Sequence, residues 1–159
     1  MLKTKRTILR NLQPADVPEL IIYRNDPQCA RYQRYGATTK EALTELVTVF
    51  AGCCFPSLEE EQHYAIVRDD VLLGDLTVFF NEADACFTLG ITIAPAHQQQ
   101  GYAFEVLAAV CARLQTQYPH RELVALIHPQ NKGSLALFRK LGFREECFAP
   151  SIDSYVYVK

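Results

Sequence analysis

The chain lacks any long hydrophobic run, and no apolar stretch approaches the roughly 18 residues that a transmembrane helix requires. Its first residues, MLKTKRTILR, also lack the apolar core of a secretory signal. The net charge is only -2 for 159 residues, so the chain has no broad basic field. These absences predict a cytoplasmic protein with neither a membrane nor a general nucleic-acid partner.

Recognised metal and nucleotide motifs are also missing. The six cysteines form no CxxC pair, and none of the four histidines has the spacing of a metal ligand. We therefore expect no metal site, and thiols that remain reduced and mostly buried. The sequence has no GxxxxGK[ST] or GxGxxG element, which disfavours a nucleotide-binding domain. It has no Ser-His-Asp or Cys-His motif in a supporting context.

The sequence instead shows an ordinary globular composition, with 49% hydrophobic and 21% charged residues. A chain of 159 residues can bury a core of its own, and it contains no repeat, low-complexity tract or linker. We therefore expect residues 1–159 to form a single domain. Oligomeric state is left open, with a homodimer as one alternative.

Hydrophobic periodicity and turn residues predict about seven strands and four helices. The expected strands are residues 6–12, 62–68, 72–80, 86–93, 123–127, 143–148 and 154–158. The expected helices begin at Pro14, at a capping box of Thr38 and Glu41, after Gly101, and at Asn131. The three middle strands read as an antiparallel meander, and a helical crossover makes 86–93 and 123–127 parallel neighbours. The fold class is therefore α+β (mixed α/β), with a mixed, mostly antiparallel sheet.

The stretch of residues 91–104, ITIAPAHQQQGYAF, carries the first functional signal. It runs from a strand through a Gly-containing turn into a helix, so unpaired amides and the positive end of the helix dipole lie together. Such a helix N-terminus is an anion site, most often for phosphate. The pattern Gln-x-x-Gly-x-Ala, with Gln98, Gly101 and Ala103, indicates backbone that wraps a phosphate group.

A second element, NKGSLALFRKLGF at residues 131–143, opens with Asn131 as a helix N-cap and ends at Gly142. Together with the loop and the apolar strand between them, it resembles the GNAT superfamily of N-acetyltransferases. TILRNLQPADVPEL (7–20) and GYAFEVL (101–107) are similar to the ribosomal-protein alanine N-acetyltransferase branch. The resemblance covers nearly the whole chain.

The resemblance implies a GNAT-like fold, acetyl-CoA as cosubstrate, and an amine acceptor attacked directly in a ternary complex. It implies that the pantetheine arm binds along the strand before the loop, and that the loop and last helix hold the remainder. The cofactor-binding residues implied in this way are Ile91, Thr92, Ile93, Gln98, Gln99, Gln100, Gly101, Tyr102, Ala103, Asn131, Ser134 and Phe138.

Catalytic candidates follow from departures from the family pattern. Phe138 stands where many members have a tyrosine proposed to protonate the departing thiolate. The resemblance implies Ser134 for this role, because a serine in the Asn-x-x-Ser element is assigned a comparable part in the ribosomal-protein branch. Thr88 stands where the branch tends to have a glutamate, so the resemblance does not identify the base. The base candidates are Glu82, Asp84, Asp75, His63 and His128, of which Glu82 and His128 are preferred.

The acceptor amine is not readable from the sequence; a protein N-terminus and a small-molecule amine both fit. Residues 28–55 are expected to shape the acceptor side, because they carry the aromatics Tyr32, Tyr35, Phe50 and Phe55. An alternative function is a non-catalytic acyl-CoA-binding or sensing module of the same fold.

Overall fold

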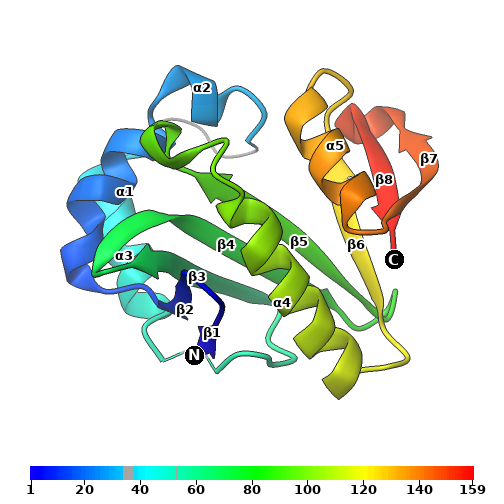
Figure 1. The fold of residues 1–159 in the computed structure, drawn as a ribbon, viewed down its shortest axis with the longest axis horizontal. Helices are drawn as coiled ribbons and strands as arrows, with labels where there is room; N and C mark the ends of the chain where they lie inside the picture. Colours follow the sequence, from blue (N-terminus) through cyan, green and yellow to red (C-terminus); the bar gives the residue numbers. More distant parts are fainter. Residues whose placement is uncertain (34–37, 53) are drawn as a thin grey trace.

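The computed structural model describes residues 1–33, 38–52 and 54–159, so Tyr35 and Cys53 lie outside the described residues. The fold is a single eight-stranded sheet in the order β1-β2-β3-β4-β5-β6-β8-β7 (Figure 1). All neighbouring strands pair antiparallel except β5 and β6, which are parallel. The mixed, mostly antiparallel sheet predicted from the sequence is confirmed.

The strands are β1 (Leu2–Lys3), β2 (Ile8–Asn11), β3 (Glu61–Arg68), β4 (Val71–Asn81), β5 (Cys86–Ile93), β6 (Glu122–Ile127), β7 (Arg144–Ala149) and β8 (Ser154–Val158). The helices are α1 (Val17–Arg24), α2 (Pro27–Ala30), α3 (Lys40–Val49), α4 (Tyr102–Gln117) and α5 (Lys132–Lys140). Two of these elements, β1 and α2, are short and were not predicted. The predicted bounds of 86–93 and 154–158 agree with those of β5 and β8.

Two hydrophobic clusters pack on the two faces of the sheet. The larger one joins α4 and α5 to β3, β4 and β5, with Val106, Leu107 and Phe87 fully buried. The smaller one joins α1 and α3 to the opposite face, where Leu20 and Leu43 are fully buried. Because side chains alternate along a strand, residues of β3 at successive positions belong to different clusters. Figure 1 shows α4 crossing one face of the sheet.

The start of α3 differs by one residue from the sequence prediction. Its N-cap is Thr39, whose side chain accepts a hydrogen bond from the amide of Ala42 at 3.2 Å, and not Thr38. Two adjacent threonines are equally able to cap a helix, and backbone conformation chooses between them: Thr39 has the extended φ of -90° and ψ of 163° that a cap needs. Among the described residues, no helix has the length and apolarity that crossing a membrane requires.

Candidate functional site

The two parallel strands stay paired over only part of their length. The β5–β6 partners are Cys86↔Glu122, Phe87↔Leu123 and Thr88↔Val124, although β5 runs on to Ile93. Beyond Thr88 the strands separate, toward the side of the molecule where α2 and α5 lie in Figure 1. The last residues of β5 thus have β4 on one side and are not paired with a strand of the described chain on the other.

A cavity of about 500 Å³ lies at this separation. Its walls come from the end of β5, the loop after it, the first turns of α4 and α5, and the segment around α2. The predicted residues Ile91, Thr92, Ile93, Gln98, Gln99, Gly101, Tyr102, Ala103, Asn131 and Ser134 all line it. The structure therefore brings together most of the residues that the sequence placed at a cofactor site.

The loop before α4 presents amides to this cavity. Gly101 is the N-cap of α4 and adopts a left-handed conformation with φ 81°, which favours glycine. The first helical hydrogen bond is donated by Glu105 N to Gly101 O at 3.1 Å, so the amides of residues 102–104 have no partner within the helix. Gln99 is also left-handed, with φ 59°. These amides and the helix dipole make a site that can bind a phosphate.

The glutamines of the loop stabilise the loop itself. Gln98 donates through Nε2 to the carbonyl of Ile93 at 2.9 Å, and Gln100 donates to the carbonyl of Ala96 at 3.2 Å. Gln100 does not line the cavity, unlike its two neighbours. No Lys or Arg of the described chain lines it either. The donors that this cavity offers to a pyrophosphate are therefore backbone amides and neutral side chains such as those of Gln99 and Ser134, and amides at a helix N-terminus fit such a group.

Arg6 contacts the loop from outside the cavity and stabilises it. This contact was not predicted from the sequence. Its guanidinium donates to the carbonyl of Gln100 at 3.0 Å and to the carboxylate of Glu105 at 2.7 Å. A Cβ added to Gly101 would lie 3.4 Å from Arg6 Nη2, so that side of the loop faces Arg6. Burial raises the pKa of Glu105, but hydrogen bonds from Thr4 and Arg6 outweigh burial and lower it overall.

The start of α5 forms the opposite wall. Asn131 caps the helix, because its side-chain oxygen accepts a hydrogen bond from the backbone amide of Ser134 at 3.1 Å, and both residues line the cavity. Phe138 lies elsewhere: it is 3% exposed and packs edge-to-face on Phe143, with ring centroids 5.0 Å apart. Leu137, one residue earlier, lines the cavity instead.

A second cavity, of about 580 Å³, adjoins the first. The two share Tyr32, Gln33, Ile91 and Thr92, and Gln33 donates through Nε2 to Thr92 Oγ1 at 2.7 Å. The second cavity extends over the face of β3, β4 and β5 that α1 and α3 cover. A bound molecule in either cavity would therefore meet its neighbour at residues 91–92.

Two charged groups on the floor of the second cavity are already paired. Arg24 and Asp75 form an ion pair at 2.6 Å, and both residues are less than 5% exposed. Asp75 also accepts the hydroxyl of Tyr23 at 2.6 Å. Because buried charges depend on their partners, this cluster fixes α1 on the sheet, and Asp75 has a structural role.

The preferred base candidates lie outside both cavities. Glu82 and Asp84 are exposed in the turn between β4 and β5, where Asp84 accepts from Asn81 Nδ2 at 2.7 Å. His128 lies after β6, 3.1 Å from Asp153 Oδ2, and its ring is 5.2 Å from that of Tyr32. His128 thus reaches the rim of the cavities through Tyr32, whereas Glu82 does not approach them.

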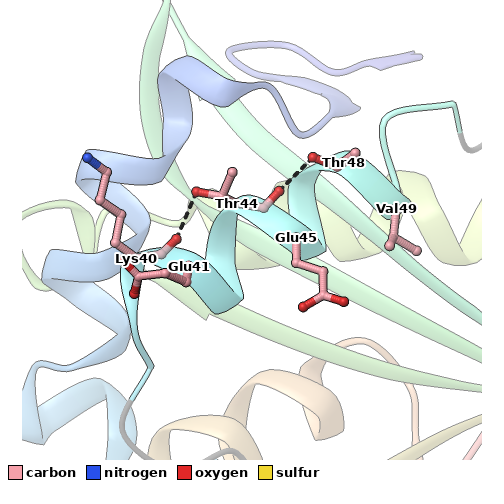
Figure 2. A pocket seen from close by; sticks show the side chains of 6 residues that line it. All are labelled: Lys40, Glu41, Thr44, Glu45, Thr48 and Val49. Carbon is pink, nitrogen blue, oxygen red and sulfur yellow. Dashed lines mark hydrogen bonds between the residues drawn. The ribbon is translucent and has the colours of Figure 1, made fainter.

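A shallow depression of about 520 Å³ lies on the outer surface of α3 (Figure 2). Its lining comes from one helix only, and the hydroxyls of Thr44 and Thr48 donate to carbonyls four residues earlier, at 2.8 Å in both cases. It shares no lining residue with the other two cavities. We interpret it as the solvated face of α3.

Comparison with known proteins shows which family and which individual proteins this chain resembles. Residues 6–144 match the family model described as "Acetyltransferase (GNAT) domain". YnaD of Bacillus subtilis (strain 168), which is called an uncharacterized N-acetyltransferase, is 25% identical over 146 residues, covering 91% of this chain and 83% of YnaD.

Two solved structures show the same fold at lower identity. A GNAT-family acetyltransferase of Bacillus anthracis superposes with a TM-score of 0.84 at 19% identity, over 99% of this chain and 96% of its own. Mycobacterium smegmatis RimJ, solved with CoA-disulfide, superposes with a TM-score of 0.80 at 17% identity, over 96% of this chain and 81% of its own.

Proposed function

The chain belongs to the GNAT acetyltransferase family, and on that premise we propose that it acetylates a primary amine by direct attack on acetyl-CoA in a ternary complex. One observation carries the proposal: the amide-lined cavity and the second cavity meet at Ile91 and Thr92, where β5 leaves β6. Two reactants that occupy the two cavities would be held in contact, and this arrangement lowers the entropic cost of their reaction.

Acetyl-CoA would occupy the first cavity. The amides at the start of α4 would hold the pyrophosphate, and the unpaired edge of β5 would hydrogen-bond the pantetheine arm. A backbone amide among residues 91–93 would stabilise the negative charge that develops on the carbonyl oxygen. Ser134 and Asn131 line the same wall, and we keep Ser134 as the proton donor to the departing thiolate.

The amine would occupy the second cavity, at the end nearest Gly90 and Ile91. The rim of the same cavity carries Glu61 on β3, whose side chain is 44% exposed, and this charge favours a cationic acceptor. Both a protein N-terminus and a small-molecule amine carry that charge at neutral pH. His128 and Glu82 are candidates for the general base on the ground of the sequence alone.

Calorimetric titration with acetyl-CoA, compared with an Ala103→Glu variant, tests the cosubstrate site. Ala103 lines the cavity in the first turn of α4, where a carboxylate is favourable to the helix but competes with a phosphate. We expect micromolar binding by the wild type and at least about a hundredfold weaker binding by the variant.

The matched control is Ala112→Glu, because Ala112 lies on the exposed side of the same helix. It adds the same charge to the chain and should bind acetyl-CoA as the wild type does. Equal binding by all three proteins would refute the placement of the pyrophosphate at α4. No binding by the wild type up to millimolar concentration would refute the proposed function.

The alternative of a non-catalytic acyl-CoA-binding module makes a different prediction. Phe138 is buried in the core and has no proton to give, so thiolate protonation depends on another group. A thiolate of acidity near that of cysteine is a tolerable leaving group without such help. Release of CoA with an amine panel therefore separates the two functions: binding without any turnover would favour the sensing module.

A further inference from the structure

One cross-strand row on the floor of the second cavity holds a histidine, a threonine and a glycine. The sheet register pairs His63 of β3 with Thr77 of β4, and Thr77 with Gly90 of β5. Directly paired residues point to the same face of a sheet, so all three face the cavity that they line. The row begins at Gly90, beside the proposed reacting centre, and ends at β3.

Gly90 leaves room over Thr77. A Cβ at residue 90 would lie 3.8 Å from the Cβ of Thr77, and Gly90 itself is exposed. An amine placed in this space would be next to Ile91, which both cavities share. Thr77 is half-buried and pairs directly with Gly90, so its hydroxyl is the polar group of the row nearest to such an amine.

Hydrogen bonds continue the row to a carboxylate. Thr77 Oγ1 lies 3.3 Å from His63 Nδ1, and His63 Nε2 lies 2.7 Å from Glu61 Oε1. With the proton on Nε2, the imidazole donates to Glu61 and its Nδ1 accepts from the threonine hydroxyl. His63 is only 6% exposed, whereas the Glu61 side chain is 44% exposed. The row thus runs from Thr77 through the buried imidazole of His63 to a carboxylate that contacts solvent.

The surroundings favour a neutral imidazole. Burial lowers the pKa of His63 and the nearby Arg24 lowers it further, while Glu61 and Asp75 act in the opposite direction. The ring of Phe50, at the end of α3, covers the imidazole with centroids 4.7 Å apart. A neutral histidine beside a carboxylate is able to accept a proton near neutral pH.

We propose that Thr77, His63 and Glu61 form a proton relay that deprotonates the acceptor ammonium, and this proposal rests on the proposed function. The ammonium gives one proton to Thr77 Oγ1 as the threonine proton passes to His63 Nδ1. Glu61 stabilises the resulting imidazolium, which loses its Nε2 proton to solvent through the carboxylate. After the product leaves, exchange of the ring protons with water restores the Nε2–H tautomer for the next turnover.

The remaining steps complete the transfer of the acetyl group to the amine. The freed amine attacks the thioester carbonyl, so a C–N bond forms and the C–S bond breaks. The second nitrogen proton goes to the leaving thiolate, and the net products are an acetamide, CoA thiol and one released proton. The relay supplies the base that Thr88 cannot provide, and it uses a carboxylate that is free to contact solvent, unlike Asp75.

The pH dependence of His63→Gln tests the relay. At pH 7 we expect kcat/KM for the amine to fall by about a hundredfold or more, since general-base catalysis has that size. The defect should shrink as the pH approaches the pKa of the amine, because the amine then needs no base. Thr77→Val should reproduce the defect, and Thr77→Ser should restore most of the activity because it keeps the hydroxyl.

A peptide with a free α-amino group and an alkyl diamine serve as acceptors, and the affinity for acetyl-CoA, which should not change, confirms folding. A defect that is constant across pH, or Thr77→Val with wild-type activity, would overturn the relay alone. If the wild type releases no CoA with either amine, the proposed function fails and the relay fails with it.

The tautomer of His63 provides a test that needs no turnover. Nitrogen NMR of imidazole-labelled wild-type protein at pH 7 should show a neutral ring with the proton on Nε2. A proton on Nδ1 would contradict the relay, because that nitrogen could not accept from Thr77. The spectrum of His63→Gln assigns the signal.

Discussion

Replacing Gly74 with alanine should destabilise the protein strongly. Gly74 of β4 pairs with Ile93 of β5, and a Cβ at residue 74 would lie 2.0 Å from the carbonyl oxygen of Thr92 and 2.9 Å from Ile93 Cα. Both contacts are with backbone, so no rotamer change can relieve them. Because a carbon and a carbonyl oxygen approach to about 3.3 Å, the strands must move apart by about 1.3 Å.

That displacement determines how far the free energy of unfolding falls. Moving one strand by about 1.3 Å stretches the local hydrogen bonds beyond their useful range, at about 1 kcal/mol for each of about two bonds. Overpacking adds about 1–3 kcal/mol. We expect the free energy of unfolding to fall by about 3–5 kcal/mol and the Tm by about 10 °C. Acetyl-CoA affinity should fall as well, because Thr92 and Ile93 line the first cavity.

Thermal and urea denaturation followed by circular dichroism measure the change. Gly52→Ala is the matched control, since a Cβ at Gly52 meets no atom of the described residues within 4 Å. It should change the stability by less than about 0.5 kcal/mol. A Gly74→Ala protein as stable as this control would show that β4 and β5 are not in the described register.

Three further predictions concern the site. Gly90→Ala should leave stability within about 0.5 kcal/mol of wild type, because its Cβ makes only an ordinary contact at 3.8 Å, but steady-state kinetics should show kcat/KM for the amine reduced at least about tenfold. Arg6→Ala should raise KM for acetyl-CoA more than it lowers kcat, and Arg6→Lys should restore little, because a lysine cannot reach the Gln100 carbonyl and Glu105 as a fork. In urea titrations the wild type should lose stability relative to His63→Gln as the pH falls below about 6.5. Burial lowers the folded-state pKa of His63, so the unfolded chain binds more protons than the folded protein below that pH.

Local signals in the sequence were sufficient to predict most of the helices and strands. The bounds of β5 and β8 were predicted correctly, because alternating residues and polar turns mark strands without reference to distant contacts. The start of α4 at Gly101 follows from the same kind of signal, since a left-handed cap favours glycine. The family resemblance is confirmed, and it identified most of the residues that line the first cavity.

Contacts between distant segments were decided only by the tertiary structure. The bond between Arg6 and Gln100 joins residues 94 positions apart, and no local pattern at either end signals it. The row of His63, Thr77 and Gly90 depends on the register of three strands, and a shift of one residue would turn each side chain to the other face. The tertiary structure likewise decided the position of Phe138, whose side chain packs in the core and does not line the cavity.

The sequence alone thus determined where most of the helices and strands lie, and it predicts a phosphate-binding loop before α4, because period, caps and turns are properties of neighbouring residues. Tertiary structure decided where β5 and β6 part and which polar groups face the second cavity. Those features arise from strand pairing and helix packing, whose partners lie far apart in the chain and are chosen by the burial of the whole core.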